Sequence, residues 1–111
     1  MIERSQDLLV EHRSGEKNGK ITTLLRREQM HEKNRLFARV LLHPGAMVPY
    51  HEHSGDAEAY YILAGVGEVN DNGVVSKVNP GDVIFTVSGE SHSLKNIGDE
   101  DLEYIALVIL D

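Results

Sequence analysis

Residues 45–65, GAMVPYHEHSGDAEAYYILAG, combine three potential metal ligands with residue types that are typical of strands and turns. His51 and His53 are two residues apart, and alternate side chains of an extended chain point to the same face, so both imidazoles can reach one point in space. Residues 54–57 are expected to bend the chain, after which Glu58 begins an apolar run. A carboxylate that enters an apolar interior is unfavourable unless it is paired or bound to a cation. A metal ion bound by His51, His53 and Glu58 would remove that penalty.

Composition limits the classes of protein that fit. A chain of 111 residues is expected to form one domain with one core. It contains no cysteine, which excludes disulfides and thiolate sites, so any metal must be held by nitrogen and oxygen. The formal net charge is −7 and the lysines and arginines are scattered, so no basic face for nucleic acid is predicted. No apolar run is long enough to cross a bilayer and no signal peptide is recognisable, so we expect a cytoplasmic protein without membrane partners.

The rest of the chain is dominated by short apolar runs separated by turn residues. Residues 71–73, Asp-Asn-Gly, predict a hairpin, and residues 79–82 predict a second turn. One helical turn is possible within 28–34, and residues 1–18 are polar apart from a possible short strand at 8–10. The predicted strands are residues 20–27, 36–43, 60–63, 66–70, 74–78, 83–87, 91–97 and 102–110. Evenly spaced short strands with almost no helix indicate an all-β barrel or sandwich, and a jelly roll fits best.

Alternation within residues 36–43 predicts which side chains face the core. Leu36, Ala38, Val40 and Leu42 form one apolar set, which should point inward. The chain is then one domain in which residues 1–35 form an N-terminal strand or arm and residues 36–111 form the barrel.

The spacing of ligands and glycines resembles the first motif of the cupin family. That motif is a glycine, five residues, His-x-His, four residues, a glutamate, six residues and a glycine. Every spacing is met here, by Gly45, His51, His53, Glu58 and Gly65.

The second cupin motif is also present. It runs from a glycine through Pro-x-Gly to a histidine and an asparagine, and the matching residues are Gly81, Val87, Gly89, His92 and Asn96. Val87 stands where the family usually has proline, which affects the turn before His92 and leaves the ligand intact. The two motifs cover residues 45–96, and their agreement is far more specific than a single His-x-His.

The resemblance implies a double-stranded β-helix, or cupin barrel, in which one divalent metal is bound by His51, His53, Glu58 and His92. Three imidazoles and a carboxylate suit manganese, iron, nickel, zinc or copper. Manganese or iron is favoured because similar cupins use them, and zinc or nickel is possible. If the ion is octahedral, four protein ligands leave two adjacent positions for water, dioxygen or a bidentate substrate.

The sequence leaves the reaction open. A small metalloenzyme acting on a polar or carboxylate substrate is one hypothesis, with oxalate-decarboxylase-like, dioxygenase-like or sugar-isomerase-like chemistry. A binding module without turnover, or a barrel with a structural metal, is the other. Tyr60 shares strand parity with Glu58 and is the candidate catalytic residue, although a packed core tyrosine is the more common role. Glu90 and Ser91 lie at a nearby turn, and no glutamate-bearing lid or cavity-facing lysine or arginine is recognisable, which weakens the decarboxylase and isomerase options.

Several polar residues outside the ligand set are expected to be structural or solvated. Asn96 should hydrogen-bond to backbone, and Arg39 falls on the outer face of its strand. The remaining histidines, His12, His31 and His43, should lie at the surface.

A second copy of the chain is the expected macromolecular partner, besides a small-molecule ligand. Phe37, Leu41, Tyr61 and Leu63 alternate to the outside of the barrel, and apolar faces of this kind are usually covered. We expect a homodimer in which residues 20–27 pair with the neighbouring subunit, as in similar cupins. The alternative is that the N-terminal segment covers this face within one chain.

Overall fold

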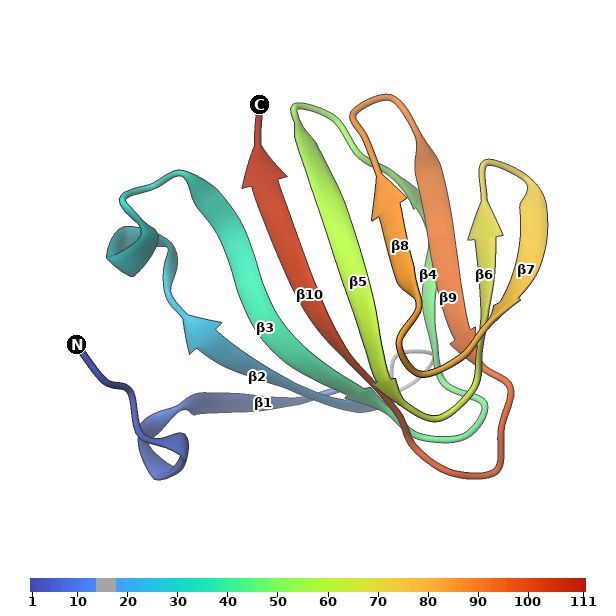
Figure 1. Cartoon of the computed structure of the whole chain (residues 1–111), viewed down its shortest axis with the longest axis horizontal. Coiled ribbons are helices and arrows are strands. Elements are labelled where there is room, and N and C mark those ends of the chain that lie inside the picture. The colour runs from blue at the N-terminus through green and yellow to red at the C-terminus, as the bar shows by residue number, and fades with distance from the viewer. Residues whose placement is uncertain (14–17) are drawn as a thin grey trace.

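The chain forms two antiparallel sheets that face each other (Figure 1). The computed structural model describes residues 1–13 and 18–111. The first sheet has six strands in the order β1 (Leu9–Arg13), β2 (Gly19–Leu25), β3 (Asn34–Leu42), β10 (Leu102–Leu110), β5 (Asp56–Ala64) and β8 (Val83–Thr86). The second has four, in the order β4 (Met47–Glu52), β9 (Ser91–Asn96), β6 (Gly67–Asp71) and β7 (Val74–Val78). This arrangement confirms the all-β, jelly-roll prediction.

Regular helix is absent from the described residues, which contain two short 3₁₀ turns, η1 (Ser5–Asp7) and η3 (Arg27–Met30). The turn η3 agrees with the helical turn predicted within residues 28–34, whereas η1 was not predicted. No helix among the described residues is long and apolar enough to span a bilayer.

Alternation along the central strands builds the core between the sheets. In β10 the inward residues Leu102, Tyr104, Ala106 and Val108 are buried, and the residues between them are partly exposed. In β3 the predicted inward set behaves in the same way, with Ala38, Val40 and Leu42 buried and Leu36 packed against the core. Strand β10 lies between β3 and β5, and its inner residues belong to the same core cluster as Val69, Val78 and Leu94 of the opposite sheet.

Strand β5 begins earlier than predicted. The bend assigned to residues 54–57 ends at Gly55, whose φ of +76° turns the chain. Asp56 and Ala57 already belong to the strand, where they pair with Leu110 and Ile109 of β10. The four extra residues bring the side chains of Asp56 and Glu58 onto one face of the strand.

The N-terminal segment extends the six-stranded sheet within the same chain. Strand β2 pairs with β3, and Ile21 lies opposite Val40. Gly19 permits this pairing, because a Cβ at that position would lie 1.9 Å from the carbonyl oxygen of Leu41. Figure 1 shows β1 and β2 reaching away from the four-stranded sheet.

The outer face of the six-stranded sheet agrees with the predicted alternation. Tyr61 and Leu63 are 47% and 40% exposed, and Arg39 lies outside, paired with Glu103. Leu41 borders an outer cavity of about 300 Å³ together with Leu8, Val10 and other residues of the N-terminal segment. The N-terminal segment therefore covers only part of this face.

The remaining polar predictions can be placed directly. Asn96 is buried, and its side-chain nitrogen donates to the carbonyl oxygens of Leu42 at 2.9 Å and Glu100 at 2.8 Å, which confirms a structural role. The histidines outside the motifs, His12, His31 and His43, are exposed as predicted.

Candidate metal centre

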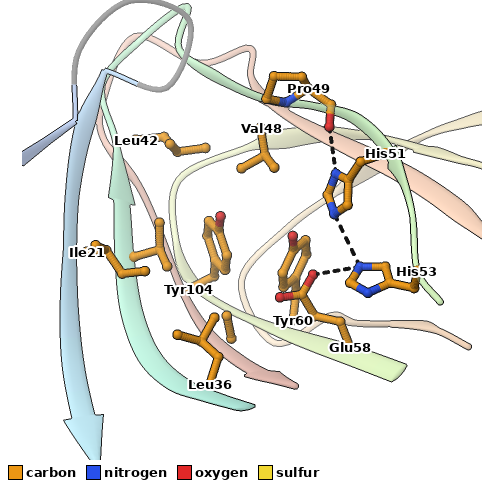
Figure 2. Close-up of a pocket in the computed structure, with 12 residues that line it drawn as sticks. Ile21, Leu36, Leu42, Val48, Pro49, His51, His53, Glu58, Tyr60 and Tyr104 are labelled. Carbon is orange, nitrogen blue, oxygen red and sulfur yellow. Dashed lines mark hydrogen bonds and ion pairs between the residues drawn. The ribbon is translucent and has the colours of Figure 1, made fainter. Parts of the chain in front are cut away.

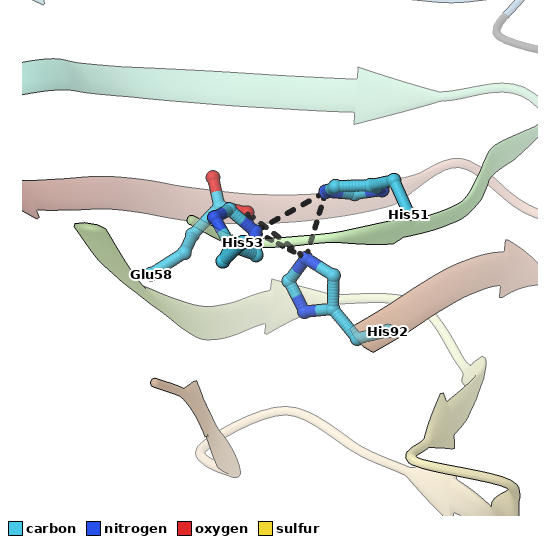
Figure 3. Close-up of side chains that lie close together, drawn as sticks. All are labelled: His51, His53, Glu58 and His92. Carbon is cyan, nitrogen blue, oxygen red and sulfur yellow. Dashed lines mark hydrogen bonds and ion pairs between the residues drawn. The ribbon is translucent and has the colours of Figure 1, made fainter. Parts of the chain in front are cut away.

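The four residues predicted as ligands meet between the two sheets (Figure 3). His51 is in β4 and His92 lies opposite it in β9, while Glu58 extends from β5 of the other sheet. His53 follows the end of β4, and its backbone is held by Glu90, whose carbonyl oxygen accepts from its N–H at 2.9 Å. The ligand atoms of all four lie within 4.8 Å of one another.

The imidazole nitrogens converge on one point. The Nε2 atoms of His51, His53 and His92 are separated by 3.2, 3.0 and 3.1 Å. Glu58 completes the group, with Oε1 at 3.2 Å from Nε2 of His53 and 3.1 Å from Nε2 of His92. Three mutually adjacent nitrogens and one oxygen beside two of them form a compact cage of donors.

The opposite ring nitrogens are already engaged, and the acceptors beside Nδ1 of His51 and His53 leave Nε2 of these two rings with its lone pair. Nδ1 of His51 donates to the carbonyl oxygen of Pro49 at 2.7 Å, and Nδ1 of His53 donates to Oδ1 of Asp56 at 2.8 Å. Nδ1 of His92 is 2.8 Å from the hydroxyl of Thr86. A neutral imidazole whose Nδ1 carries the proton presents an acceptor at Nε2. Acceptors that converge in this way repel one another unless a cation lies between them.

The donor spacing fits a divalent ion. Neighbouring donors around an octahedral ion lie about 3.0 Å apart when each bond is about 2.1 Å, against about 3.4 Å around a tetrahedral ion. The five separations of 3.0–3.2 Å are nearer the octahedral value. The group of His51, His53, Glu58 and His92 could therefore hold a metal ion, and nothing in the spacing selects one metal.

The burial of the ligand side chains increases the stabilisation that a cation would provide. His53, Glu58 and His92 are buried, and His51 is partly exposed. Among the described residues, the basic side chains in contact with the Glu58 carboxylate are the two neighbouring histidines, with no lysine or arginine. A buried carboxylate next to three imidazole nitrogens is stabilised by a positive ion.

A cavity of about 260 Å³ opens beside the ligands (Figure 2). His51, His53 and Glu58 form one side of it, and Tyr60 and Tyr104 lie between that side and the aliphatic residues opposite. Tyr60 points inward as its strand parity predicted: it is buried, its ring stacks on His92 with centroids 5.0 Å apart, and its hydroxyl lies 3.5 Å from Nε2 of that histidine.

The two other acid or hydroxyl candidates lie outside the cavity. Glu90 accepts hydrogen bonds from the backbone N–H of Val87 at 3.0 Å and from the side chain of Asn72 at 3.0 Å, so its carboxylate joins two turns. The backbone N–H of Ser91 donates to the Asn72 side chain. Neither residue is among those that line the cavity beside the ligands.

Sequence reasoning missed the groups that orient the ligands. Asp56 is buried and bridges Nδ1 of His53 and the guanidinium of Arg35. Thr86 is buried beside His92, and Tyr104 and Ile21 line the cavity. Only Asp56 had a usable signal, because it precedes Glu58 by two residues and so shares its face of the strand.

Known proteins agree with this fold. The model of the cupin domain family matches residues 38–109. An oxalate-binding protein from Thermotoga maritima is 47% identical over 114 residues, which cover 99% of this chain and 94% of that protein. A crystal structure of a predicted oxalate decarboxylase from Thermotoga maritima is 46% identical, with a TM-score of 0.92 over 100% of both chains.

More distant structures share the fold alone. A putative sugar phosphate isomerase from Acidithiobacillus ferrooxidans is 20% identical, with a TM-score of 0.82 over 97% of this chain and 74% of its own. The two histidine-containing motifs, the pair of facing sheets and the match over most of the barrel lead to one conclusion: the chain belongs to the cupin domain family.

Proposed function

We propose that His51, His53, Glu58 and His92 bind one divalent metal ion and that the loaded site binds a small chelating carboxylate in the adjoining cavity. The convergence of three Nε2 atoms and a buried carboxylate supports the metal site. Manganese or iron is the first choice for the ion, and zinc or nickel is possible. The name of the 47% identical relative, an oxalate-binding protein, makes oxalate the reference ligand.

Charge explains why the ion would control anion binding. The described residues that line the cavity include no lysine or arginine, so no side chain there offers a carboxylate a full positive charge. Glu58 neutralises one charge of a divalent ion, which leaves a net positive charge at the cavity wall. When bound, the ion supplies this charge and Lewis acidity. Among the described lining residues, Tyr60 and Tyr104 are the polar side chains other than the ligands themselves.

Isothermal titration calorimetry with oxalate tests this proposal. Protein loaded with manganese and passed through a desalting column should bind one oxalate per chain. Protein stripped with a chelator and dialysed should bind none, because the cavity then presents the Glu58 carboxylate without a compensating cation. Equal oxalate affinity in the loaded and stripped proteins would show that the proposal is wrong.

Catalysis is the second candidate, and Tyr60 is the observation that favours it. Decarboxylation of oxalate breaks the carbon–carbon bond and releases carbon dioxide, and the remaining carbon must take a proton to become formate. The Tyr60 hydroxyl, 3.5 Å from Nε2 of His92, is a proton-bearing group beside the ligands. Binding ranks first because the described residues that line the cavity include no carboxylic acid besides Glu58. Formate release by the loaded protein, lost in Tyr60→Phe, would instead establish the enzyme and the catalytic role of Tyr60.

Isomerase chemistry fits the cavity less well, and oxygenase chemistry requires few protein groups beyond the metal ligands. A sugar phosphate isomerase needs cationic groups for the phosphate, and the described lining has none. An oxygenase needs only the metal and a pocket, so oxygen uptake in the presence of small carboxylic acids remains a useful screen.

We also propose a homodimer formed through the outer face of the six-stranded sheet, where Tyr61, Val83 and Phe85 are exposed. Exchange of residues 20–27 between subunits stays a prediction, as do the division into an arm of residues 1–35 and a barrel of 36–111 and the location in the cytoplasm.

A further inference from the structure

The cavity beside the candidate metal centre has two chemically different sides. His51, His53 and Glu58 form one side, and Figure 2 shows Ile21, Leu36 and Leu42 on the other. The aliphatic lining comes from four strands and consists of Ile21, Leu36, Val40, Leu42, Val48 and Ala106, with Pro49 beside them. A ligand held by the metal would therefore extend toward hydrocarbon.

Part of this hydrocarbon surface is left uncovered by the protein. Ile21, Leu36 and Val48 pack against the core yet are only partly buried, and all three line the cavity. Apolar surface that stays in contact with water is a source of affinity for any ligand that covers it. The cavity of about 260 Å³ has room for several water molecules, each of which takes about 30 Å³.

Oxalate would use only the metal side of this cavity. Its two carboxylates form the chelating head and leave no carbon to cover Ile21, Leu36 or Val48. A longer dicarboxylate fits worse, because its second charge would lie against aliphatic side chains with no lysine or arginine among the described lining residues. The arrangement suits an anion that has one chelating head and an apolar tail.

We infer that the preferred ligands are 2-oxo or 2-hydroxy carboxylates with an alkyl side chain, whose carboxylate and adjacent oxygen face the metal ligands and whose tail covers Ile21, Leu36 and Val48. This inference rests on the proposed metal-dependent binding of carboxylates and names the ligand class. The N-terminal strand β2 then contributes to specificity, because Ile21 reaches the cavity from that strand.

A homologous series of acids tests the tail with the head held constant. Calorimetry of the manganese-loaded protein with pyruvate, 2-oxobutanoate and 4-methyl-2-oxopentanoate should show affinity rising with tail length. Each methylene removed from water strengthens binding by about fourfold, so three added carbons predict a gain of more than tenfold and up to about sixtyfold. Oxalate serves as the reference without a tail.

Two cavity variants and one matched control locate the effect. Ile21→Ala removes part of the apolar wall. Val48→Thr keeps the shape of the side chain while replacing one methyl group with a hydroxyl. Each variant should reduce the preference for 4-methyl-2-oxopentanoate over pyruvate at least threefold. Ile97→Ala removes the same atoms as Ile21→Ala at an exposed position outside the cavity and should leave the preference unchanged. Melting curves confirm that each variant is folded, and Val48→Thr keeps the test usable if Ile21→Ala is not.

The outcomes separate this inference from the function on which it rests. Metal-dependent oxalate binding with a flat or falling series of oxo acids would overturn the inference and leave the proposed function standing. Failure of every acid to bind the loaded protein would overturn both. A rising series that is unchanged in both cavity variants would place the tail elsewhere and contradict the assignment to Ile21 and Val48.

Discussion

Asp56 connects the candidate metal centre to the surface of the protein. Its side chain is only 5% exposed, and its two oxygens contact Nδ1 of His53 and the guanidinium of Arg35, whose side chain is half-exposed. A carboxylate that accepts the Nδ1 proton fixes the ring orientation and makes Nε2 a better ligand. Arg35 in turn compensates the buried charge. The pair of Asp56 and Arg35 therefore positions His53 without contacting the metal position itself.

Replacing this carboxylate should weaken metal binding. We predict that Asp56→Asn lowers manganese affinity by about 10- to 100-fold, because the neutral amide is a poorer acceptor for the His53 ring. Competition with a fluorescent chelator measures the affinity. Arg35→Gln is the matched control: it keeps the contact between His53 and Asp56 and should have the smaller effect. Unchanged affinity in Asp56→Asn would show that the hydrogen bond to His53 is irrelevant to the metal.

The two motifs were sufficient to predict which residues converge, because the ligand spacing is local to each motif. His51 and His53 are two residues apart in one segment, and the strand that carries His92 lies next to theirs. The orienting groups depend on pairings that no local pattern reveals. Arg35 contacts Asp56, which lies 21 positions later in the sequence. The bend predicted at residues 54–57 had placed Asp56 in a turn.

Gly65 constrains the connection between two strands, because it lies in the turn from β5 to β6. Its φ is +86°, and a Cβ there would lie 2.5 Å from the carbonyl oxygen of Asp101 and 2.8 Å from Cα of Leu102. Both the backbone conformation and the close approach of the chain at the start of β10 require glycine. The chain can enter the four-stranded sheet at this point only if the side chain is absent.

Gly65→Ala should destabilise the fold by about 3 kcal/mol or more, because conformational strain of about 1–2 kcal/mol is combined with a backbone clash. Gly73→Ala provides the comparison: its φ is +92° and a Cβ there meets nothing within 4 Å, so only the strain term applies. Urea unfolding curves measure both. Equal losses in the two variants would mean that the contact with Asp101 has no energetic weight.

Strand positions were predicted best where turn chemistry is explicit. The strands β7 and β10 match their predicted bounds, since Asn-Gly and the acidic turn before Leu102 separate them cleanly. The start of β5 was missed because Asp56 is a poor strand former, and its pairing with Leu110 outweighs that local preference. The turn η1 was missed for lack of any apolar periodicity in residues 1–7.

The whole molecule presents an apolar sheet face that the N-terminal segment leaves partly open. Val83 lies opposite Tyr61, and Phe85 lies opposite Ala59, so their side chains share the outer face of β5 and β8. Tyr61 is 47%, Val83 65% and Phe85 52% exposed. A second copy that packs its own sheet against this surface would bury all three, which is the basis of the predicted homodimer.

Sedimentation equilibrium at micromolar concentration should give the mass of two chains. Phe85→Lys should convert the dimer to a monomer, because a charged side chain cannot be buried there without a partner. Val75→Lys introduces the same charge at an exposed position of β7 in the other sheet and should leave the dimer intact. A mass of one chain for the unmodified protein would contradict the dimer, and loss of the dimer only in Val75→Lys would place the interface on the opposite sheet.

The number of metal ions bound per chain tests most directly whether the two sheets form a metal site from four ligand residues. Protein exposed to manganese and then desalted should contain one ion per chain by plasma mass spectrometry. His92→Ala should retain almost none, while the exposed His12→Ala should match the unmodified protein. Absence of metal from the unmodified protein, or a full complement in His92→Ala, would contradict a site built from His51, His53, Glu58 and His92.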